Sequence, residues 1–295
     1  MSTIVQTEIT SSTQRLQSAQ RRRKTWTTII SYAILIILMV VTLLPIVWMI
    51  LTSFKSEMEV SQFPPQILPQ AWHLDNFAQA WNFAPFGQYL INTLLIAGSI
   101  TLIQTITCSL AAYAFARLRF RFRDALFLLY LATLMVPSQV TVIPLFILMR
   151  NLNWIDTYHG LIIPQAFSAF GTFLLRQFFL TIPFELEDSA RIDGASRLRC
   201  FLQIIVPLSG TALATLAVFI FLYHWNNLLW PLIMANSDAT FPIAVGLRNF
   251  QGQFANAWNL LMAAATLATI PVIALYLFTQ RWFVKGIVVS GFGGR

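Results

Sequence analysis

Six long stretches of the sequence contain no Asp, Glu, Lys or Arg, and they constrain the fold more than any other feature. They cover residues 25–54, 76–116, 125–149, 157–175, 200–237 and 249–280. Because a helix needs roughly 20 apolar residues to cross the hydrocarbon core of a bilayer, each stretch can hold one crossing. A Lys, Arg or Asp at mid-membrane costs about 2.5–3.5 kcal/mol on insertion scales, so segments that cross a bilayer are expected to lack charged residues. The sequence therefore predicts an all-α membrane protein with six transmembrane helices.

The composition argues against the alternative, six buried core helices of a large soluble protein. Only 10% of the residues are charged and 57% are hydrophobic, whereas soluble domains carry about a quarter charged residues. Five of the six predicted crossings contain a proline, which bends a helix and suits a protein that opens alternately to two sides, although static bundles contain such helices too. The predicted crossings are about 26–52, 89–115, 124–149, 160–180, 201–224 and 258–281.

The basic residues are divided unevenly between the two sides of these crossings. Sixteen of the 19 lie in the two terminal tails or in the loops after the second and fourth crossings, and the other side has only Lys55, Arg150 and Arg248. By the positive-inside rule the basic side is cytoplasmic, so both termini are predicted to lie in the cytoplasm. The net charge of +8 then reports membrane orientation rather than nucleic-acid binding, and we expect no nucleic-acid partner.

Charge and polarity also divide the chain into parts. Residues 1–24 are polar and predict a disordered cytoplasmic tail, and residues 25–88 hold the first transmembrane helix and an external loop. Within that loop, residues 74–81 predict an amphipathic helix at the outer interface. Residues 89–285 form the main transmembrane domain, and 286–295 form a second cytoplasmic tail. Two cysteines, within and beside crossings, predict neither a disulfide nor a metal site.

The segment between the fourth and fifth crossings, residues 181–208, is longer than a plain connector needs. Acidic residues at its start predict a helix N-terminus, where the helix dipole favours negative charge. Gly194 suits the left-handed residue after that helix, and Ser196 suits the N-cap of the next. Glu187 and Arg191 have the i,i+4 spacing of a surface ion pair. This capped helix pair predicts a docking element for a soluble partner; an interfacial helix that only anchors the loop is the alternative.

The same segment resembles the EAA loop of binding-protein-dependent ABC importer permeases. The family pattern is Glu-Ala-Ala, three residues, Gly, nine residues and Ile-x-Leu-Pro, and this chain keeps every spacing with residues 188–190, Gly194 and 204–207. Asp188, Ser189 and Val206 depart from the pattern, and the shorter acid and the hydroxyl would alter the docking contact. The resemblance covers roughly residues 30–295 and follows the carbohydrate branch, in particular its second permease subunit, at 92–94, 136–139, 143–145, 173–177, 225–232 and 280–286.

The resemblance implies a type I ABC importer permease fold over 89–285, in a bacterial inner membrane, with no catalytic site of its own. Its implied function is half of the pathway for a sugar or related polyol. The implied partners are a second permease subunit, an ABC ATPase dimer that binds ATP and Mg, an extracytoplasmic solute-binding protein and membrane lipid. The chain itself has no Gly-x-x-x-x-Gly-Lys-Ser/Thr phosphate loop, and we expect no cofactor or metal in it. The implied ATPase-coupling residues are Glu187, Asp188, Ser189, Ala190, Asp193 and Gly194.

A neutral polar solute needs hydrogen-bonding amides and aromatic faces along an uncharged path. The sequence offers Gln139, Gln165, Trp225, Asn226 and Asn227, together with Gln104 and Trp230. The same amides also bond neighbouring helices in membrane bundles, and that alternative stays open. Glycerol phosphate is an alternative solute, although an anion should need a cation in the path. An ion-coupled secondary transporter is a further alternative, but such proteins usually place Asp, Glu or His within the membrane, and the six stretches contain no acid.

Overall fold

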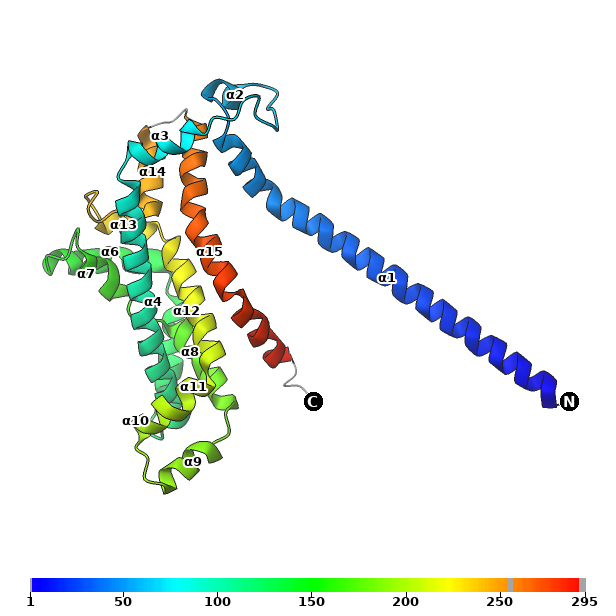
Figure 1. The fold of residues 1–295 in the computed structure, drawn as a ribbon. Helices are drawn as coiled ribbons and strands as arrows, with labels where there is room; N and C mark the ends of the chain where they lie inside the picture. Colours follow the sequence, from blue (N-terminus) through cyan, green and yellow to red (C-terminus); the bar gives the residue numbers. More distant parts are fainter. Residues whose placement is uncertain (1, 254–256, 292–295) are drawn as a thin grey trace.

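The computed structural model describes residues 2–253 and 257–291, and every regular element among them is a helix (Figure 1). In chain order the elements are α1 (Ser2–Ser53), α2 (Glu57–Ser61), α3 (Asp75–Phe83), α4 (Phe86–Arg117), α5 (Arg123–Ala132), η1 (Thr133–Met135), α6 (Ser138–Asn151), α7 (Tyr158–Ile162), η2 (Ile163–Gln165), α8 (Ala169–Thr181), α9 (Glu185–Ile192), α10 (Arg197–Cys200), the π-helix η3 (Phe201–Ile205), α11 (Val206–Leu208), α12 (Gly210–Trp225), α13 (Leu229–Met234), α14 (Ile243–Gln253) and α15 (Trp258–Gly291). The helix predicted at 74–81 is α3. The predicted tail 286–295 lies partly outside the described residues.

Three of the predicted crossings are single helices, long and apolar enough to span a bilayer. They are Thr27–Ser53 within α1, the whole of α4, and Trp258–Phe278 within α15. Two more are bent pairs, in which α5–η1 meets α6 at 96° and α10–α11 meets α12 at 80°. The fourth crossing is made of α7, η2 and α8, and α8 alone has only 13 residues. The described residues thus hold up to five crossings by length and composition, with a shorter, interrupted segment between them.

The crossings predicted at 124–149 and 201–224, each of which contains proline, are sharply bent in the structure. The first break follows Val136, which is extended (φ −83°, ψ 114°) before Pro137, as the proline ring requires of its predecessor. The second break lies at Ser209, shortly after Pro207, which cannot donate a helical hydrogen bond. Each crossing is therefore an angled pair of helices rather than a rod.

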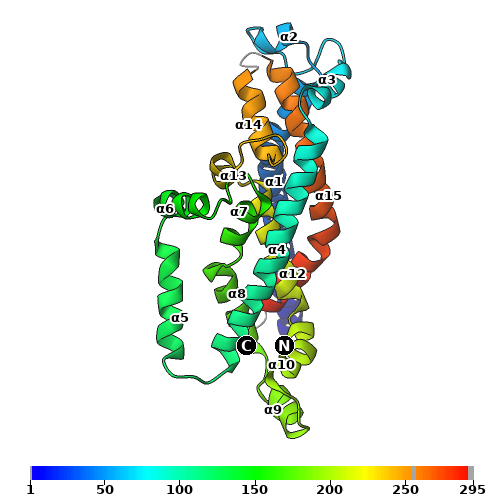
Figure 2. The same ribbon diagram turned by 90° about the vertical axis from the view of Figure 1, so that its left-hand side faces the viewer.

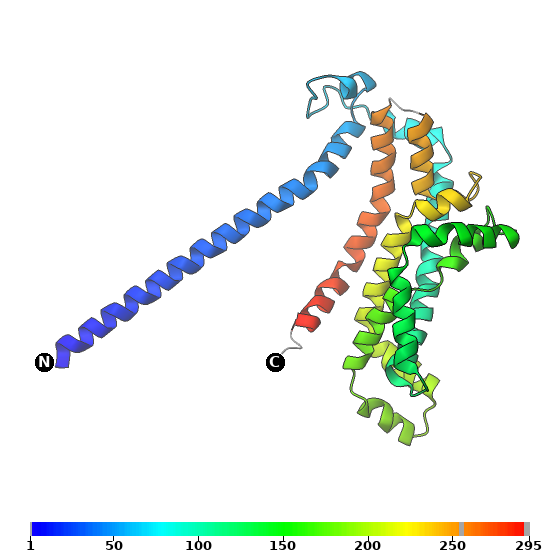
Figure 3. The ribbon, with the colours of Figure 1, turned by 180° about the vertical axis from the view of Figure 1, so that it is seen from behind.

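The first helix departs from the rest of the fold. Figures 1 and 3 show α1 leaving the other helices at an angle, with its N-terminal end far from them. Residues 2–24, predicted to be disordered, are helical in the structure, because the segment has no Gly or Pro to end a helix that propagates from the crossing. Side chains of residues 27–48 are exposed, which leaves an apolar surface for lipid or another subunit.

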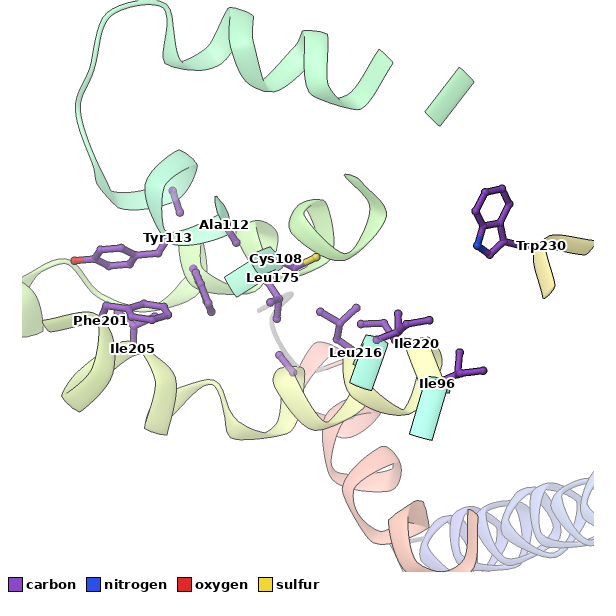
Figure 4. Close-up of a cluster of buried hydrophobic side chains, with 14 of the residues drawn as sticks. Ile96, Cys108, Ala112, Tyr113, Leu175, Phe201, Ile205, Leu216, Ile220 and Trp230 are labelled. Atoms are coloured by element: carbon purple, nitrogen blue, oxygen red, sulfur yellow. The ribbon is translucent and has the colours of Figure 1, made fainter. Parts of the chain in front are cut away.

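The main core lies where α4, α8 and α12 pack together. Figure 4 shows Cys108 and Ala112 of α4 and Leu175 of α8 close to Leu216 of α12, among the buried side chains of this cluster. Gly171 permits the close approach, because a Cβ there would lie 2.9 Å from the Cys108 sulfur. Small residues at helix contacts are the usual means of packing in membranes. Figure 2 shows α5 standing to one side of this core, with α6 above it on the same side.

Hydrogen bonds fix the loops that join α6 to α7 and α13 to α14. The Asn92 amide donates to the Ala239 and Phe241 carbonyls at 2.9 and 3.0 Å, and the Tyr158 hydroxyl donates to Asn92 at 2.8 Å. The Asp156 carboxylate accepts from the Asn236 backbone N–H at 2.9 Å. Burial alone would raise the pKa of Asp156, but such hydrogen bonds hold that pKa below its usual range. These loops are therefore ordered by side chains rather than left free.

Candidate coupling site

The helix α9 lies beyond the ends of α4, α8 and α12, at the opposite end of the molecule from α2 and α3 (Figures 1 and 2). Three acids occupy its first turn, where the helix dipole favours them. Gly194 follows with φ +85°, and the Ala195 N–H returns to the Ala190 carbonyl at 2.9 Å. Ser196 then caps α10 by accepting from the Arg199 N–H. The predicted helix, left-handed turn and capped second helix are all confirmed.

The sequence predicted that Glu187 is on the surface, but in the structure its side chain is buried. Its carboxylate lies 3.2 Å from the Arg117 Nε, and the two side chains are only 3% and 0% exposed. The Tyr113 hydroxyl donates to the other carboxylate oxygen at 2.9 Å. The expected surface pair with Arg191 is therefore wrong, and Glu187 anchors α9 to α4 from inside. The physical reason is the packing of α9 against α4, which buries Glu187 beside the Arg117 guanidinium and the Tyr113 hydroxyl, whereas Arg191 is exposed.

Arg117 joins three elements at this end of the bundle. Its guanidinium donates to the carbonyls of Phe179 and Ile182, the second at 2.6 Å. Both carbonyls lie at the C-terminal end of α8, where the helix dipole is negative, and the Phe179 carbonyl also accepts from the Ile182 N–H at 3.2 Å. The guanidinium also lies over the Phe184 ring, 4.1 Å from its centroid. A single side chain from α4 thus holds the end of α8 and the start of α9.

The outward surface of α9 carries acidic, small and apolar side chains together. Asp188, Ser189, Asp193 and Gly194 are exposed, and Ala190 is half-buried. Ile192 is 87% exposed at the end of the helix, which is unusual for so large an apolar side chain. The sequence reasoning missed Ile192, although an isoleucine between charged residues in a short helix is a readable signal. An apolar knob rimmed by acids suits a protein partner with a complementary groove.

The proposed solute-path residues do not gather into one site in the structure. Gln104 donates to the Gln165 backbone carbonyl at 2.5 Å, and the Asn226 amide donates back to Leu222 of its own helix at 2.8 Å. Trp225 is buried in a second core cluster. These contacts fit the alternative interpretation of the sequence, in which these amides and aromatic rings hold neighbouring helices together rather than line a solute path. The Asn227 side-chain oxygen accepts from the Trp230 backbone N–H at 3.5 Å, near the start of α13. Gln139 is exposed on α6.

The structure is thus a helical membrane bundle with bent crossings and a short, internally anchored helix displayed at one end. The family described as binding-protein-dependent transport system inner membrane component matches residues 105–289. The chain belongs to this family. It is a multi-pass protein of the bacterial inner membrane and a permease subunit of an ABC importer, with no catalytic role of its own.

Individual relatives and solved structures agree with this assignment. The chain is 40% identical over 271 residues to the sn-glycerol-3-phosphate transport system permease protein UgpE of Yersinia enterocolitica, covering 89% of this chain and 96% of the relative. It is 38% identical to UgpE of Escherichia coli O1:K1, covering 90% and 97%. A bacterial ABC transporter that imports the acidic polysaccharide alginate has a chain of the same fold, with a TM-score of 0.77 and 25% identity over 86% of this chain and 95% of that one. A second alginate transporter structure, with an alginate-bound periplasmic protein, has a TM-score of 0.62 at 17% identity over 84% and 91%.

Proposed function

We propose that the chain forms half of the membrane pathway of an importer for a sugar or related polyol, and that α9 receives the motion of an ATPase dimer. The observation that carries this proposal is the construction of α9. Its outer surface is free among the described residues, while Glu187 and Arg117 tie its inner surface to α4. A push on Asp188, Ser189, Ala190, Asp193 or Gly194 therefore moves α4 and α8 rather than a loose loop.

The proposed assembly contains a second permease subunit, two ATPase subunits that bind ATP and Mg, and an extracytoplasmic solute-binding protein. The solved alginate transporter bound to a periplasmic protein supports an assembly of this kind. Gln139 and Gln165 stay as proposed solute contacts, whereas Trp225, Asn226 and Asn227 are better explained by packing and helix ends.

The relatives favour a polyhydroxylated solute and give a second candidate. One relative transports sn-glycerol-3-phosphate and the other imports alginate, and both of these solutes are anionic. A phosphorylated polyol or an acidic sugar is therefore the second candidate beside a neutral sugar. We expect a neutral disaccharide, an alginate oligosaccharide or sn-glycerol-3-phosphate, presented by the cognate binding protein, to stimulate ATP hydrolysis by the reconstituted complex. Stimulation by an amino acid instead would show that the solute class is wrong.

The orientation follows from charge and predicts which side α9 occupies. Cysteine placed at Ser189 on α9 should react with a membrane-impermeant maleimide only in inside-out vesicles. Cysteine at Ser61 of α2 is the matched control and should react only in right-side-out cells. Both positions are exposed, and the natural Cys108 and Cys200 are buried, so the introduced thiol carries the signal. Labelling of position 189 from outside would overturn the proposed orientation.

A further inference from the structure

A pocket of about 260 Å³ lies at the end of the molecule opposite α9, where the C-terminal end of α1 meets α2 and the first turns of α15 (Figures 1 and 3). Drug-sized ligands occupy pockets of about 300–1,000 Å³, so this one suits a smaller polar group. Neither the coupling site nor the proposed path uses it. Its lining residues are Trp48, Thr52, Lys55, Glu59, Val60, Pro65, Trp258 and Met262.

Lys55 brings a buried positive charge to this pocket. The residue is only 2% exposed. Its ammonium donates to the Gln66 carbonyl at 2.5 Å and lies 4.5 Å from the Trp48 ring centroid, but no carboxylate of the described residues lies within ion-pair distance. An ammonium has three donors, so donor capacity remains. The buried Thr52 hydroxyl in the same lining also has no hydrogen-bond partner among the described residues.

Glu59 brings the opposite charge. Its two carboxylate oxygens accept from the backbone N–H groups of Ser56 at 2.7 Å and Gln70 at 2.6 Å. These N–H groups, that of Ser56 first, hold the pKa of Glu59 below its usual range, so the carboxylate is ionised at neutral pH. The pocket therefore contains one cation and one anion that do not pair with each other. Such a lining is complementary to a small zwitterion.

Hydrogen bonds between the surrounding elements preform the pocket. The Asn76 amide of α3 donates to the backbone carbonyls of Ser53 and Lys55 at 2.9 and 2.8 Å. The Asn259 side-chain amide of α15 donates to the Asn76 side-chain oxygen, Oδ1, at 3.3 Å. The end of α1 is thus fixed against α3 and α15 although the rest of α1 stands apart. A ligand entering here meets side chains whose backbone is already held in place.

We propose that this pocket binds the phosphoethanolamine headgroup of a phospholipid, with the phosphate at Lys55 and Thr52 and the ammonium at Glu59. Its position supports a lipid. Trp48 and Trp258 lie near the ends of the crossings Thr27–Ser53 and Trp258–Phe278, and tryptophan is enriched where a membrane meets water. The neighbouring surface of α1 is apolar and exposed, so acyl chains can lie along it. By the orientation proposed above, the lipid comes from the outer leaflet.

The test is lipid retention by the whole importer complex in nanodiscs of mixed phosphatidylethanolamine and phosphatidylglycerol. After transfer to mild detergent, native mass spectrometry counts the lipids bound to each complex. Lys55→Met removes the charge and keeps much of the apolar stem, and we expect it to reduce bound phosphatidylethanolamine about tenfold, the loss of one charge-assisted hydrogen bond. Thr52→Val removes a hydroxyl that has no partner, so it should reduce binding while leaving the complex assembled. Arg150→Gln, exposed on the same predicted side, is the matched control and should change nothing.

Three results would overturn the proposal. One is unchanged phosphatidylethanolamine retention in both Lys55→Met and Thr52→Val complexes. Another is equal retention of phosphatidylglycerol, which lacks the ammonium that Glu59 would bind. The third is displacement of the lipid by soluble glycerophosphoethanolamine at equal concentration, since the pocket would then be a site for a free zwitterion. Transport activity enters none of these readouts, so failure here is distinct from failure of the proposed import function.

Discussion

Replacing Gly194 with valine is expected to abolish solute-stimulated ATPase activity while the chain still inserts in the membrane. Gly194 has φ +85°, and a β-branched residue there costs roughly 1–2 kcal/mol and shifts the turn. The space around the added Cβ is open, so no clash within this chain explains the effect. What changes is the direction in which α9 is presented relative to α10. The measurement is ATP hydrolysis by proteoliposomes with and without solute-loaded binding protein.

The matched control for this substitution is Gly194→Asn. Asparagine adopts left-handed geometry more readily than other residues with a side chain, so most of the stimulation should survive. Normal stimulation in Gly194→Val, with ATPase subunits bound, would contradict the assignment of α9 as the coupling element. Loss in both variants to the same extent would mean that the size of the side chain matters rather than the turn, because both add volume to the same open surface.

Removing either partner of the Arg117–Glu187 pair is expected to destabilise the permease by about 3–5 kcal/mol, since the other charge is then buried alone. Arg117→Ala also removes the guanidinium donor from the Phe179 and Ile182 carbonyls, although the Phe179 carbonyl keeps its bond from the Ile182 N–H. We expect a lower thermal unfolding midpoint of the purified complex and a loss of stimulated ATPase activity. Asp188→Asn, an exposed substitution one residue away from Glu187, should leave the unfolding midpoint unchanged.

The double variant Arg117→Met with Glu187→Leu separates the charge effect from the packing effect. Replacing a buried ion pair by apolar residues of similar volume is often neutral or stabilising, so the double variant should regain much of the lost stability. If the two single losses simply add, the pair does not act as a unit. Single variants as stable as Asp188→Asn would show that the pair does not anchor α9.

The crossings, and the presence of prolines that can bend them, could be read from the sequence, but which prolines break the helix could not. Long stretches without charged residues identify the segments that lie in the bilayer, and each stretch can be recognised from its own residues alone. The prolines, in contrast, have different effects at different places: α1 and α15 pass through Pro45 and Pro271 as continuous helices, whereas the chain breaks beside Pro137. Neighbouring helices decide whether the freed backbone groups find partners, and one sequence does not show those neighbours.

In the candidate coupling site, too, the features set by local sequence were predicted and those set by distant contacts were not. The roles of Gly194 and Ser196 are set by residues within one turn, so their pattern predicted them correctly. The burial of Glu187 depends on Arg117 and Tyr113, which lie about 70 residues earlier in the chain. Acidic residues at the start of a helix are usually exposed, and nothing local distinguished Glu187 from Asp188. Only the packing of α9 against α4 shows which of the two faces inward.

The central claim is that the outer surface of α9 contacts an ATPase subunit, and crosslinking tests it most directly. A photoreactive amino acid at position 192, where Ile192 is largely exposed, should crosslink to the ATPase subunit in the assembled importer. The same probe at Trp81 of α3, exposed at the opposite end, should not. The account predicts a permease–ATPase adduct from position 192 alone. An assembled, ATP-hydrolysing complex in which position 192 gives no such adduct, or in which position 81 gives one, would contradict it.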